Sequence, residues 1–565
     1  MDKKIDENIP SNLGGKPKIA YFSMEIGINE NIPTYSGGLG VLAGDTIKSC
    51  ADLNIPIVAV TLLSEKGYFY QKIDENGNQV ELPLEFSIED HLDKLPSMTK
   101  VDIEGREVKI QVWYYPVKGI SGFVVPVFFL DTNVEGNSDW DRSLTKYLYG
   151  GDNKYRLAQE IILGVGGVRM LKSLGYTTID KYHMNEGHAA LSTVELFNRF
   201  NDIDKVRNHC VFTTHTPVPA GHDQFDLDMT KDMVGDLLPD FILDDITFEN
   251  RLNMTRLALF FSHYVNGVAK KHGEVSRMMF PGYSIDSITN GVHSPSWVSE
   301  PFQRLFDKHM PGWRSDPYIL RSAFSIDKQE IWDAHLEAKR NLIDFVNKEY
   351  NADMNEDVFT IGFARRQTAY KRPDLLISNL GRLLEIAEKS GYIQIIYAGK
   401  AHPKDGSGKQ AIKKIFEAMK SINDDKVKMT FIQNYNLGVA KKLIPGVDLW
   451  LNTPRRPKEA SGTSGMKAAH NGVPQFGTLD GWWLEGCIEN ITGWSIGPEK
   501  TDEDASDDEI DRNELYDKLG NWIIPKFYQD RDNWIRTMRS CIAINASFFN
   551  TNRMIQQYVL NAYFK

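Results

Sequence analysis

The sequence predicts an α/β protein built from two doubly wound, Rossmann-like domains that face each other across a cleft. Its 565 residues are too many for one hydrophobic core, which favours two large domains. Each half of the chain carries a series of short apolar strands separated by helix-like segments, as in parallel sheets that are covered on both faces. Several of these strands stop in glycine-rich or polar turns, which is where such sheets bind their ligands.

Composition narrows the class of partner. A net charge of −11 without a long basic run argues against nucleic acid or an anionic membrane as the main partner, although local cations could hold a small anion. The four cysteines lie far apart without a Cys-x-x-Cys spacing, which is typical of reduced thiols rather than of disulfides or a zinc site. The polar N-terminal segment and the lack of a long apolar run predict a cytoplasmic protein, and we expect no bound metal.

The N-terminal half begins with a strand, a glycine turn and a helix. Residues 18–22 are predicted as the strand, residues 34–40 contain three glycines, Gly38 among them, and the helix that follows repeats apolar residues on one face. A helix that starts after such a turn can bind an anion through its free backbone N–H groups. An ordinary tight turn is the alternative, and the next strand, residues 55–63, supports a βαβ unit without deciding between them.

Three further turns in this half carry polar side chains at predicted strand ends. Two strands within residues 108–130 and a long helix at about residues 153–174 come first. The next two strands end close to His188 and His215, and a later one ends at Asn290. Ligands of an open parallel sheet lie at these carboxyl ends, so all three residues are candidates for a substrate site. The alternatives are a structural buried histidine or helix cap, and for Asn290 a plain turn.

The C-terminal half begins a second α/β series with a basic turn. A strand predicted at residues 358–363 is followed by Arg365, Arg366, Lys371 and Arg372. Four cations directly after a strand repel one another unless an anion lies among them, so the turn is a candidate anion site. A solvated basic turn is the alternative, and we expect Arg372, beyond Lys371, to tolerate replacement by lysine.

A glycine-rich segment at residues 459–472 follows the last strands of this half. It places Lys467 among small and apolar neighbours, where a lysine can lose its charge and attack an aldehyde. The glycines and hydroxyls before it can close on a phosphate, so the segment suits a Schiff base beside a phosphate. A glycine-rich turn with a solvated lysine is the alternative. The acidic run at residues 502–511 is interpreted as a solvated insertion.

These elements predict two domains, residues 1–295 and residues 296–565. Two doubly wound domains with a cleft between them are the architecture of glycosyltransferases of the GT-B type. The helices from about residue 530 can cross back to the first domain.

The motifs, in this order, resemble those of the α-glucan phosphorylases, the glycogen, starch and maltodextrin phosphorylase family, in a short form. Residues 459–463 with Met466 and Lys467 resemble the family's cofactor segment, and residues 365–372 its phosphate-binding segment. Residues 37–40 resemble its glycine loop. His215 and Asn290 resemble its sugar-site histidine and asparagine.

The resemblance implies a role for each matching residue. It implies that Lys467 forms the Schiff base with the cofactor, pyridoxal 5′-phosphate (PLP). Thr463 and Gly38 would lie near the cofactor phosphate, and Tyr370 beside both this phosphate and the substrate phosphate. On the substrate phosphate it places Arg366 and Lys371. At the glucosyl unit it places His215, Asn290, Glu459, Ser461 and Gly462. Two departures stand out, because family members usually carry lysine at Arg365 and Gly-Asn at Ser464-Gly465.

The implied reaction is the retaining phosphorolysis of an α-1,4-glucan or maltooligosaccharide by inorganic phosphate, which yields glucose 1-phosphate. A homo-oligomer is possible. Two alternatives remain open at this point. A nucleotide-sugar-dependent glucan synthase of the same fold would need no Schiff-base lysine, and a non-catalytic glucan-binding protein would bind glucan without PLP.

Overall fold

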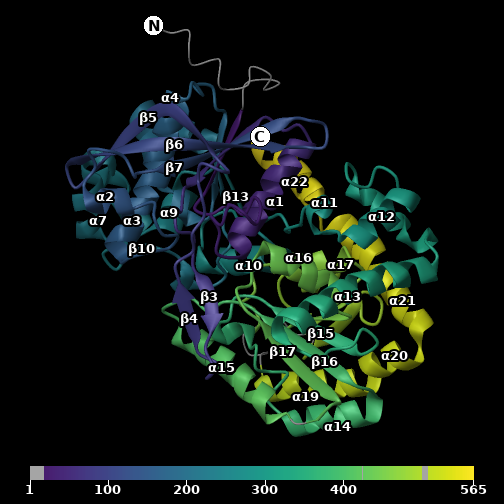
Figure 1. Ribbon diagram of the computed structural model, residues 1–565. Coiled ribbons are helices and arrows are strands. Elements are labelled where there is room, and N and C mark those ends of the chain that lie inside the picture. Colours follow the sequence, from purple (N-terminus) through teal and green to yellow (C-terminus); the bar gives the residue numbers. More distant parts are fainter. Residues whose placement is uncertain (1–17, 423, 499–506, 565) are drawn as a thin grey trace.

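The computed structural model describes residues 18–422, 424–498 and 507–564. It contains two large sheets, one formed by strands of residues 19–287 and the other by strands of residues 359–496, and helices cover both (Figure 1). This confirms the predicted α/β class with two doubly wound sheets. None of the described helices combines the length and the apolar character that crossing a bilayer requires.

The N-terminal sheet has nine strands in the order β14-β13-β9-β8-β1-β2-β7-β6-β5. Strands β5 to β7 pair antiparallel, and the other pairs are parallel. The bounds are β1 Ile19–Ser23, β2 Ile57–Leu62, β5 Asp93–Ile103, β6 Arg106–Lys118, β7 Val124–Asp131, β8 Lys181–Asn185, β9 Cys210–Thr213, β13 Tyr264–Gly267 and β14 Asp286–Ser287.

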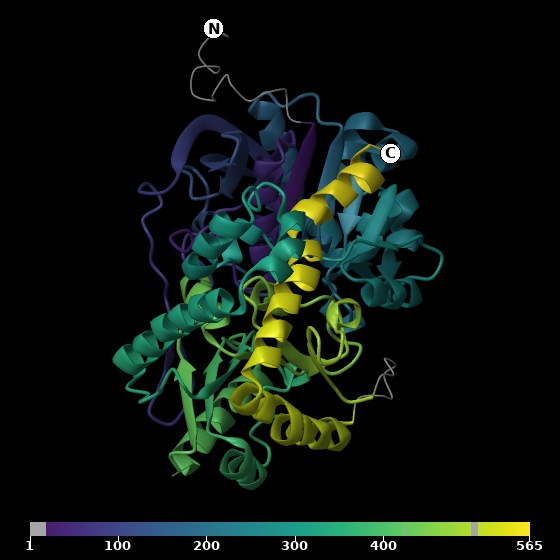
Figure 2. The same cartoon turned by 90° about the vertical axis from the view of Figure 1, so that its right-hand side faces the viewer.

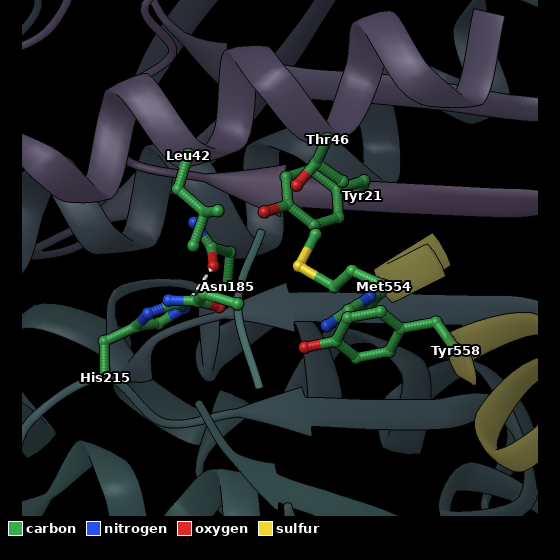
Figure 3. A pocket seen from close by; sticks show the side chains of 9 residues that line it. Tyr21, Leu42, Thr46, Asn185, His215, Met554 and Tyr558 are labelled. Carbon is green, nitrogen blue, oxygen red and sulfur yellow. Dashed lines mark hydrogen bonds between the residues drawn. The ribbon is translucent and has the colours of Figure 1, made fainter. Parts of the chain in front are cut away.

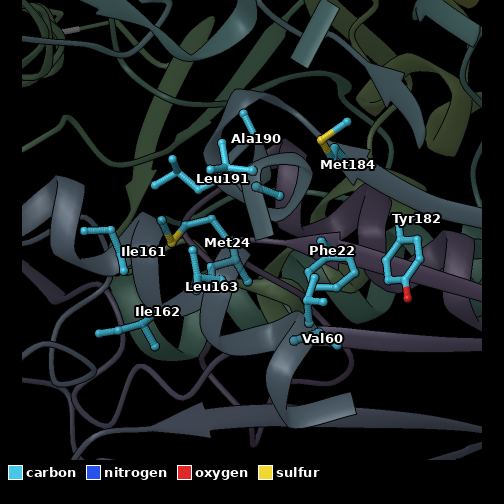
Figure 4. Close-up of a cluster of buried hydrophobic side chains, with 14 of the residues drawn as sticks. Phe22, Met24, Val60, Ile161, Ile162, Leu163, Tyr182, Met184, Ala190 and Leu191 are labelled. Atoms are coloured by element: carbon cyan, nitrogen blue, oxygen red, sulfur yellow. The ribbon is translucent and has the colours of Figure 1, made fainter. Parts of the chain in front are cut away.

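The central strand of this sheet is buried on both faces. Phe22 of β1 packs in a cluster with the continuous helix formed by α3 (Asn153–Ile161), the π-helical turn η1 (Ile162–Gly166) and α4 (Gly167–Ser173), part of which Figure 4 shows. Tyr21 packs on the opposite face, with α1 (Gly38–Asp52) and α22 (Thr551–Tyr558). This alternation follows from the period-2 arrangement of side chains on a strand.

Other helices and short strands complete this half. The helices are α2 Asp139–Ser143, α5 Leu191–Phe200, α6 Ile203–His209, α7 Leu227–Val234, α8 Leu243–Ile246, α9 Met254–Phe260 and α10 Lys270–Met279. The next two helices, α11 Ser294–Trp297 and α12 Glu300–His309, pack in clusters with residues of the C-terminal half. A small antiparallel sheet contains β10 Gln224–Asp226, β11 Thr247–Phe248 and β12 Arg251–Asn253.

The C-terminal sheet is parallel throughout, in the order β17-β16-β15-β18-β19-β20. Counted along the chain this is the strand order 3-2-1-4-5-6, in which the direction of winding reverses between β15 and β18. Residues that follow β15 and β18 therefore meet at the position where such sheets bind ligands. The bounds are β15 Phe359–Ala364, β16 Ile393–Ala398, β17 Val427–Ile432, β18 Leu449–Asn452, β19 Gln475–Thr478 and β20 Gly493–Ile496.

Helices on this sheet continue into a run that ends at the C-terminus. They are α13 Lys328–Tyr350, α14 Leu380–Ser390, α15 Gly406–Ser421, α16 Leu437–Gly446, α17 Ser464–Ala469, α18 Trp483–Gly486, α19 Asp508–Lys518, α20 Ile524–Gln529 and α21 Arg531–Ser540. Figure 2 shows the last of them, with the π-helical turn η10 (Cys541–Ala546) and α22, running from the C-terminal sheet to the N-terminal one.

Two segments tie the halves together. The hairpin of β3 (Tyr70–Ile73) and β4 (Gln79–Leu82) reaches the C-terminal sheet, where the Gln79 side chain donates to Ala401 O and accepts from Ala401 N, both at 2.9 Å. In the opposite direction, the segment before α22 pairs with the N-terminal half, because Val292 and Asn550 form a parallel β-bridge. Each half is thus contacted by a segment that belongs to the other.

The acidic run after β20 differs from the prediction of a solvated insertion. Residues 499–506 lie outside the described residues. Within the rest of the run, the fully buried Asp511 accepts from Arg372 and Arg456, and Asp508 pairs with Arg372 and Arg455. The carboxylates at the start of α19 therefore neutralise buried arginines, which a charge pattern alone does not reveal.

A Cβ at Gly291 would lie 2.2 Å from the backbone carbon of Asn550, so Gly291→Ala should push the crossing segment away and destabilise the protein by about 1–3 kcal/mol. Calorimetry should show a lower unfolding temperature. At Gly381, near the start of α14, the nearest atom to a new Cβ lies 3.6 Å away, and Gly381→Ala should leave the unfolding temperature unchanged or raise it. Equal unfolding temperatures for the two variants would contradict the close approach.

Candidate active site

The basic turn after β15 is mostly neutralised by carboxylates of the protein. Arg365 Nη2 lies 2.5 Å from Glu459 Oε2, and Lys371 Nζ bonds to the same oxygen. Arg372 is 4% exposed and donates to Asp511 Oδ2 at 2.7 Å, so the expectation that it would tolerate lysine as a solvated residue is wrong. Among the described residues, no carboxylate lies within ion-pair distance of Arg366, which is exposed and has Nη2 3.5 Å from Ser36 Oγ. Arg366 is therefore the cation of this turn that the described carboxylates leave unneutralised.

Glu459 is the centre of the buried charges at the winding reversal. Burial acts to raise its pKa, but Arg365 and Lys371 lower that pKa to about 2. Burial and the neighbouring Arg365 lower the pKa of Lys371 to about 7, although Glu459 opposes them. Asp480 accepts from Glu459 N at 2.8 Å, and burial, together with the Glu459 charge, raises the pKa of Asp480 to about 7. Lys371 and Asp480 therefore both titrate near neutral pH around a carboxylate that stays ionised.

The glycine turn before α1 is held by a buried carboxylate. Glu25 accepts from Ser36 N at 2.5 Å and Gly37 N at 3.2 Å, and from Tyr149 OH at 2.8 Å. Gly40 must be glycine, because a Cβ there would lie 2.6 Å from Glu25 Oε2. No side chain caps α1 after Gly37, so its first N–H groups can serve an anion beside Arg366.

His215 and Asn290 line one small pocket, which Figure 3 shows next to α1. His215 Nε2 lies 2.6 Å from Asn185 Oδ1, and the His215 backbone N donates to Glu186 Oε2 at 2.7 Å. Burial lowers the pKa of His215 to about 3, so the imidazole is neutral at physiological pH. Asn290 Oδ1 is buried and has no partner among the residues that the structure describes, which leaves it able to accept a hydrogen bond from a ligand. His188 is not part of this pocket and lies 3.4 Å from Asp223.

Lys467 is 7% exposed in α17, and its amine lies over an aromatic ring. Nζ is 3.9 Å from the centroid of the Trp297 ring, and Trp297 Nε1 donates to Asp45 Oδ2 at 2.7 Å. In the described part of the chain no hydrogen-bond acceptor or carboxylate pairs with Nζ. Burial lowers the pKa of Lys467 to about 8, with Asp45 opposing that shift and Lys48 adding to it. A substantial fraction of the amine is therefore neutral and nucleophilic near pH 8.

These residues fit a cofactor that carries an aldehyde and a phosphate, such as PLP. A buried amine without a partner suits the aldehyde, and the uncapped start of α1 suits the phosphate. The start of α1 is open at Gly38, since a Cβ there would meet no atom within 4 Å. Thr463 immediately precedes α17 and Ser461 Oγ is buried without a partner. The ring of Tyr370 lies 4.4 Å from Lys371 Nζ, at the basic turn.

Helix α1 is the element that connects these groups. Its start lies against Arg366. Its residues Leu42 and Thr46 line the pocket of His215, and its Asp45 binds the Trp297 ring that lies beneath the Lys467 amine. Sequence reasoning missed the positioning residues that do not belong to a motif, which are Glu25, Asp45, Trp297 and Asp480. The only one of them that the sequence could have indicated is Asp45, because an acidic residue stands out among the apolar residues at the start of this helix.

Comparisons with known proteins agree on one family. Its profile, described as carbohydrate phosphorylase, matches residues 222–491. A maltodextrin phosphorylase of Thermococcus litoralis is 37% identical over 97% of this chain and 70% of its own length. A glycogen phosphorylase of Aquifex aeolicus is 32% identical over 97% of this chain and 86% of its own length. An uncharacterised protein of Methanocaldococcus jannaschii is 32% identical over 96% of this chain and 99% of its own length.

The low pKa of Lys467 predicts early reaction with a small aldehyde. In protein freed of bound small molecules, reductive methylation of Lys467 should have its pH midpoint at about 8, as measured by mass spectrometry of peptides. Asp45→Asn should lower this midpoint, because the carboxylate favours the charged amine. The exposed Lys389 is the internal reference for the amount of reagent and for peptide recovery. A Lys467 midpoint that Asp45→Asn leaves unchanged would contradict the influence of this carboxylate on the buried amine.

Proposed function

This chain belongs to the carbohydrate phosphorylase family, and from that premise we propose that it is an α-1,4-glucan phosphorylase that uses PLP. It transfers a terminal glucosyl unit from a glucan or maltooligosaccharide to inorganic phosphate with retention, which yields glucose 1-phosphate. The two sheets correspond to the GT-B arrangement. A buried, partner-free Lys467 beside the helix whose uncapped start lies against Arg366 is the observation that carries the proposal.

Lys467 and the start of α1 hold the cofactor in this proposal. Lys467 binds it covalently through the neutral amine, and Gly38 and Thr463 lie at its phosphate. When bound, PLP supplies a phosphate that can exchange a proton near neutral pH, since the second pKa of a phosphate is about 6. The protein excludes water around Lys467, because Trp297 covers the amine and Asp45 fixes the ring.

The cations after β15 bind the substrate phosphate. Arg366 can offer two parallel N–H donors to an anion at the start of α1. Lys371 adds a charge that depends on Glu459, its present partner. Binding of the phosphate then favours the protonated form of Lys371, and both cations stabilise a transition state in which the sugar gains positive and the phosphate negative charge.

The sugar lies between the pocket residues and the glycine-rich segment. The neutral His215 and the unpartnered Asn290 Oδ1 offer hydrogen bonds to its hydroxyls, and Glu459, Ser461 and Gly462 do so from the other half. A neutral imidazole suits this role, because a positive charge there would oppose the charge that develops on the sugar.

The two departures from the usual family residues have local explanations. A Cβ on Gly465 would lie 1.7 Å from Gln475 Oε1, so the asparagine that is usual there does not fit. Ser464 Oγ accepts from Trp450 Nε1 at 3.0 Å, which a glycine could not do. Arg365 bonds to both Glu459 and Asn452, whereas a lysine would have a single ammonium group for them.

The decisive experiment is the release of glucose 1-phosphate from a maltooligosaccharide and phosphate by the purified protein. Borohydride reduction should then fix the cofactor to the Lys467 peptide, as seen in its mass, and Lys467→Ala should abolish this label and the activity together. Turnover that needs a nucleotide sugar and ignores phosphate would favour a glucan synthase. Glucan binding without a cofactor or turnover would favour a binding protein.

Arg366→Lys tests whether the fork of the guanidinium is needed. The charge is kept but the two parallel donors are lost, so kcat/KM for phosphate should fall by about 10²–10³, equivalent to about 2–4 kcal/mol in the transition state. Arg372 cannot serve as the control because it is buried on two carboxylates. Arg340, whose side chain is 52% exposed and pairs with Glu356, is a suitable one, and Arg340→Lys should leave the kinetics unchanged. Equal, small effects at Arg366 and Arg340 would place the phosphate elsewhere.

A further inference from the structure

A guanidinium from the C-terminal helix holds the loop that carries Asn290. Arg553 of α22 donates from Nη1 to Thr289 O at 2.6 Å and from Nη2 to Asn290 O at 2.9 Å. Its third nitrogen, Nε, donates to Phe548 O at 3.0 Å, and Nη1 also donates to Gln557 Oε1 at 2.9 Å. One planar guanidinium thus binds the carbonyl oxygens of two consecutive residues and fixes the orientation of the peptide between them. The backbone from which the Asn290 side chain projects is therefore held in place.

A carboxylate from the C-terminal half holds the same loop from another side. Both oxygens of Glu485, in α18, lie 2.9 Å from Thr289 Oγ1, and Oε1 also accepts from Lys270 N at 3.0 Å. The charge of Glu485 also favours the charged form of Arg553, whose pKa burial lowers to about 10. Arg553 is therefore still a cation at neutral pH, and its two charge-assisted bonds are stronger than neutral ones.

We propose that Arg553 is a positioning residue for the glucosyl site and acts through Asn290, with Glu485 in support. The inference rests on the proposed function, because it assigns the purpose of the clamp to sugar binding. Among the described residues Asn290 Oδ1 has no partner, and Asn290 lines the pocket of His215, so the hydrogen bonds that place this residue are those of its backbone. A displacement of about 1 Å at such a group can cost about 10² in rate.

A purely structural clamp is the competing explanation. Arg553 also crosses from one half to the other, and the ring of Phe548 lies 4.8 Å from its guanidinium carbon, so its loss could simply loosen the contact between the halves. The two explanations differ in coupling. A positioning residue has no further effect once Asn290 is removed, whereas independent effects multiply.

A double-mutant cycle with Arg553→Met and Asn290→Ala therefore tests the proposal. The methionine keeps part of the packing but removes every donor of the guanidinium, and kcat/KM for glucose 1-phosphate in the synthetic direction should fall by about 10-fold to 10²-fold. In the Asn290→Ala background the same change should have less than a 3-fold effect. Calorimetric titration with glucose should show weaker binding for both single variants. Arg553→Lys, which keeps the buried charge but not the fork, should fall between wild type and Arg553→Met.

Arg207→Met is the matched control, because Arg207 also donates to a backbone carbonyl, Phe260 O at 2.8 Å, outside the site. It should leave both kinetics and glucose binding unchanged. Effects of Arg553→Met and Asn290→Ala that multiply would overturn the inference, as would unchanged glucose binding in Arg553→Met. If Arg553→Met does not fold, the cycle with Arg553→Lys decides by the same criterion. A wild-type protein without phosphorolytic activity would refute the proposed function instead.

Discussion

The burial of α1 between the two halves is the constraint on which the site depends. One face of the helix packs on β1, and α22 covers it from the C-terminal end of the chain, where Ser49 Oγ lies 2.5 Å from Thr551 Oγ1. Because α1 cannot rotate, its uncapped start stays directed at Arg366 while Asp45, about two turns later, stays under Trp297. A rigid helix is thereby able to serve an anion and an amine at once.

Charge in the site is balanced by the protein before any ligand binds. Glu459 neutralises two cations of the basic turn, and Asp508 and Asp511 neutralise a third. This balance keeps like charges from repelling one another in a buried position, and it leaves Arg366 for a ligand. It also makes Lys371 responsive, since a phosphate that competes with Glu459 would change the environment that sets its pKa.

The sequence predicted most of what depends on local pattern. Strands β1, β2 and β15 were expected within one or two residues of their bounds, because apolar runs that end in glycine or polar turns are strong signals. The hairpin β3–β4 was missed, because its two strands are short and partly exposed and have no hydrophobic core of their own. The residue to which its Gln79 side chain bonds, Ala401, lies in the other half of the chain. The buried Asp511 was misjudged for the same reason, as an acidic run does not reveal distant arginines.

Both halves contribute to the surroundings of the Lys467 amine. Its low pKa arises from burial, to which the Trp297 ring contributes by covering the amine, whereas Asp45 of α1 holds that ring and its charge opposes the shift. Water reaching this position would stabilise the charged amine again and remove the nucleophile. In the proposed function, the α22 crossing that covers α1 therefore supports the surroundings of Lys467 as well as the contact between the halves.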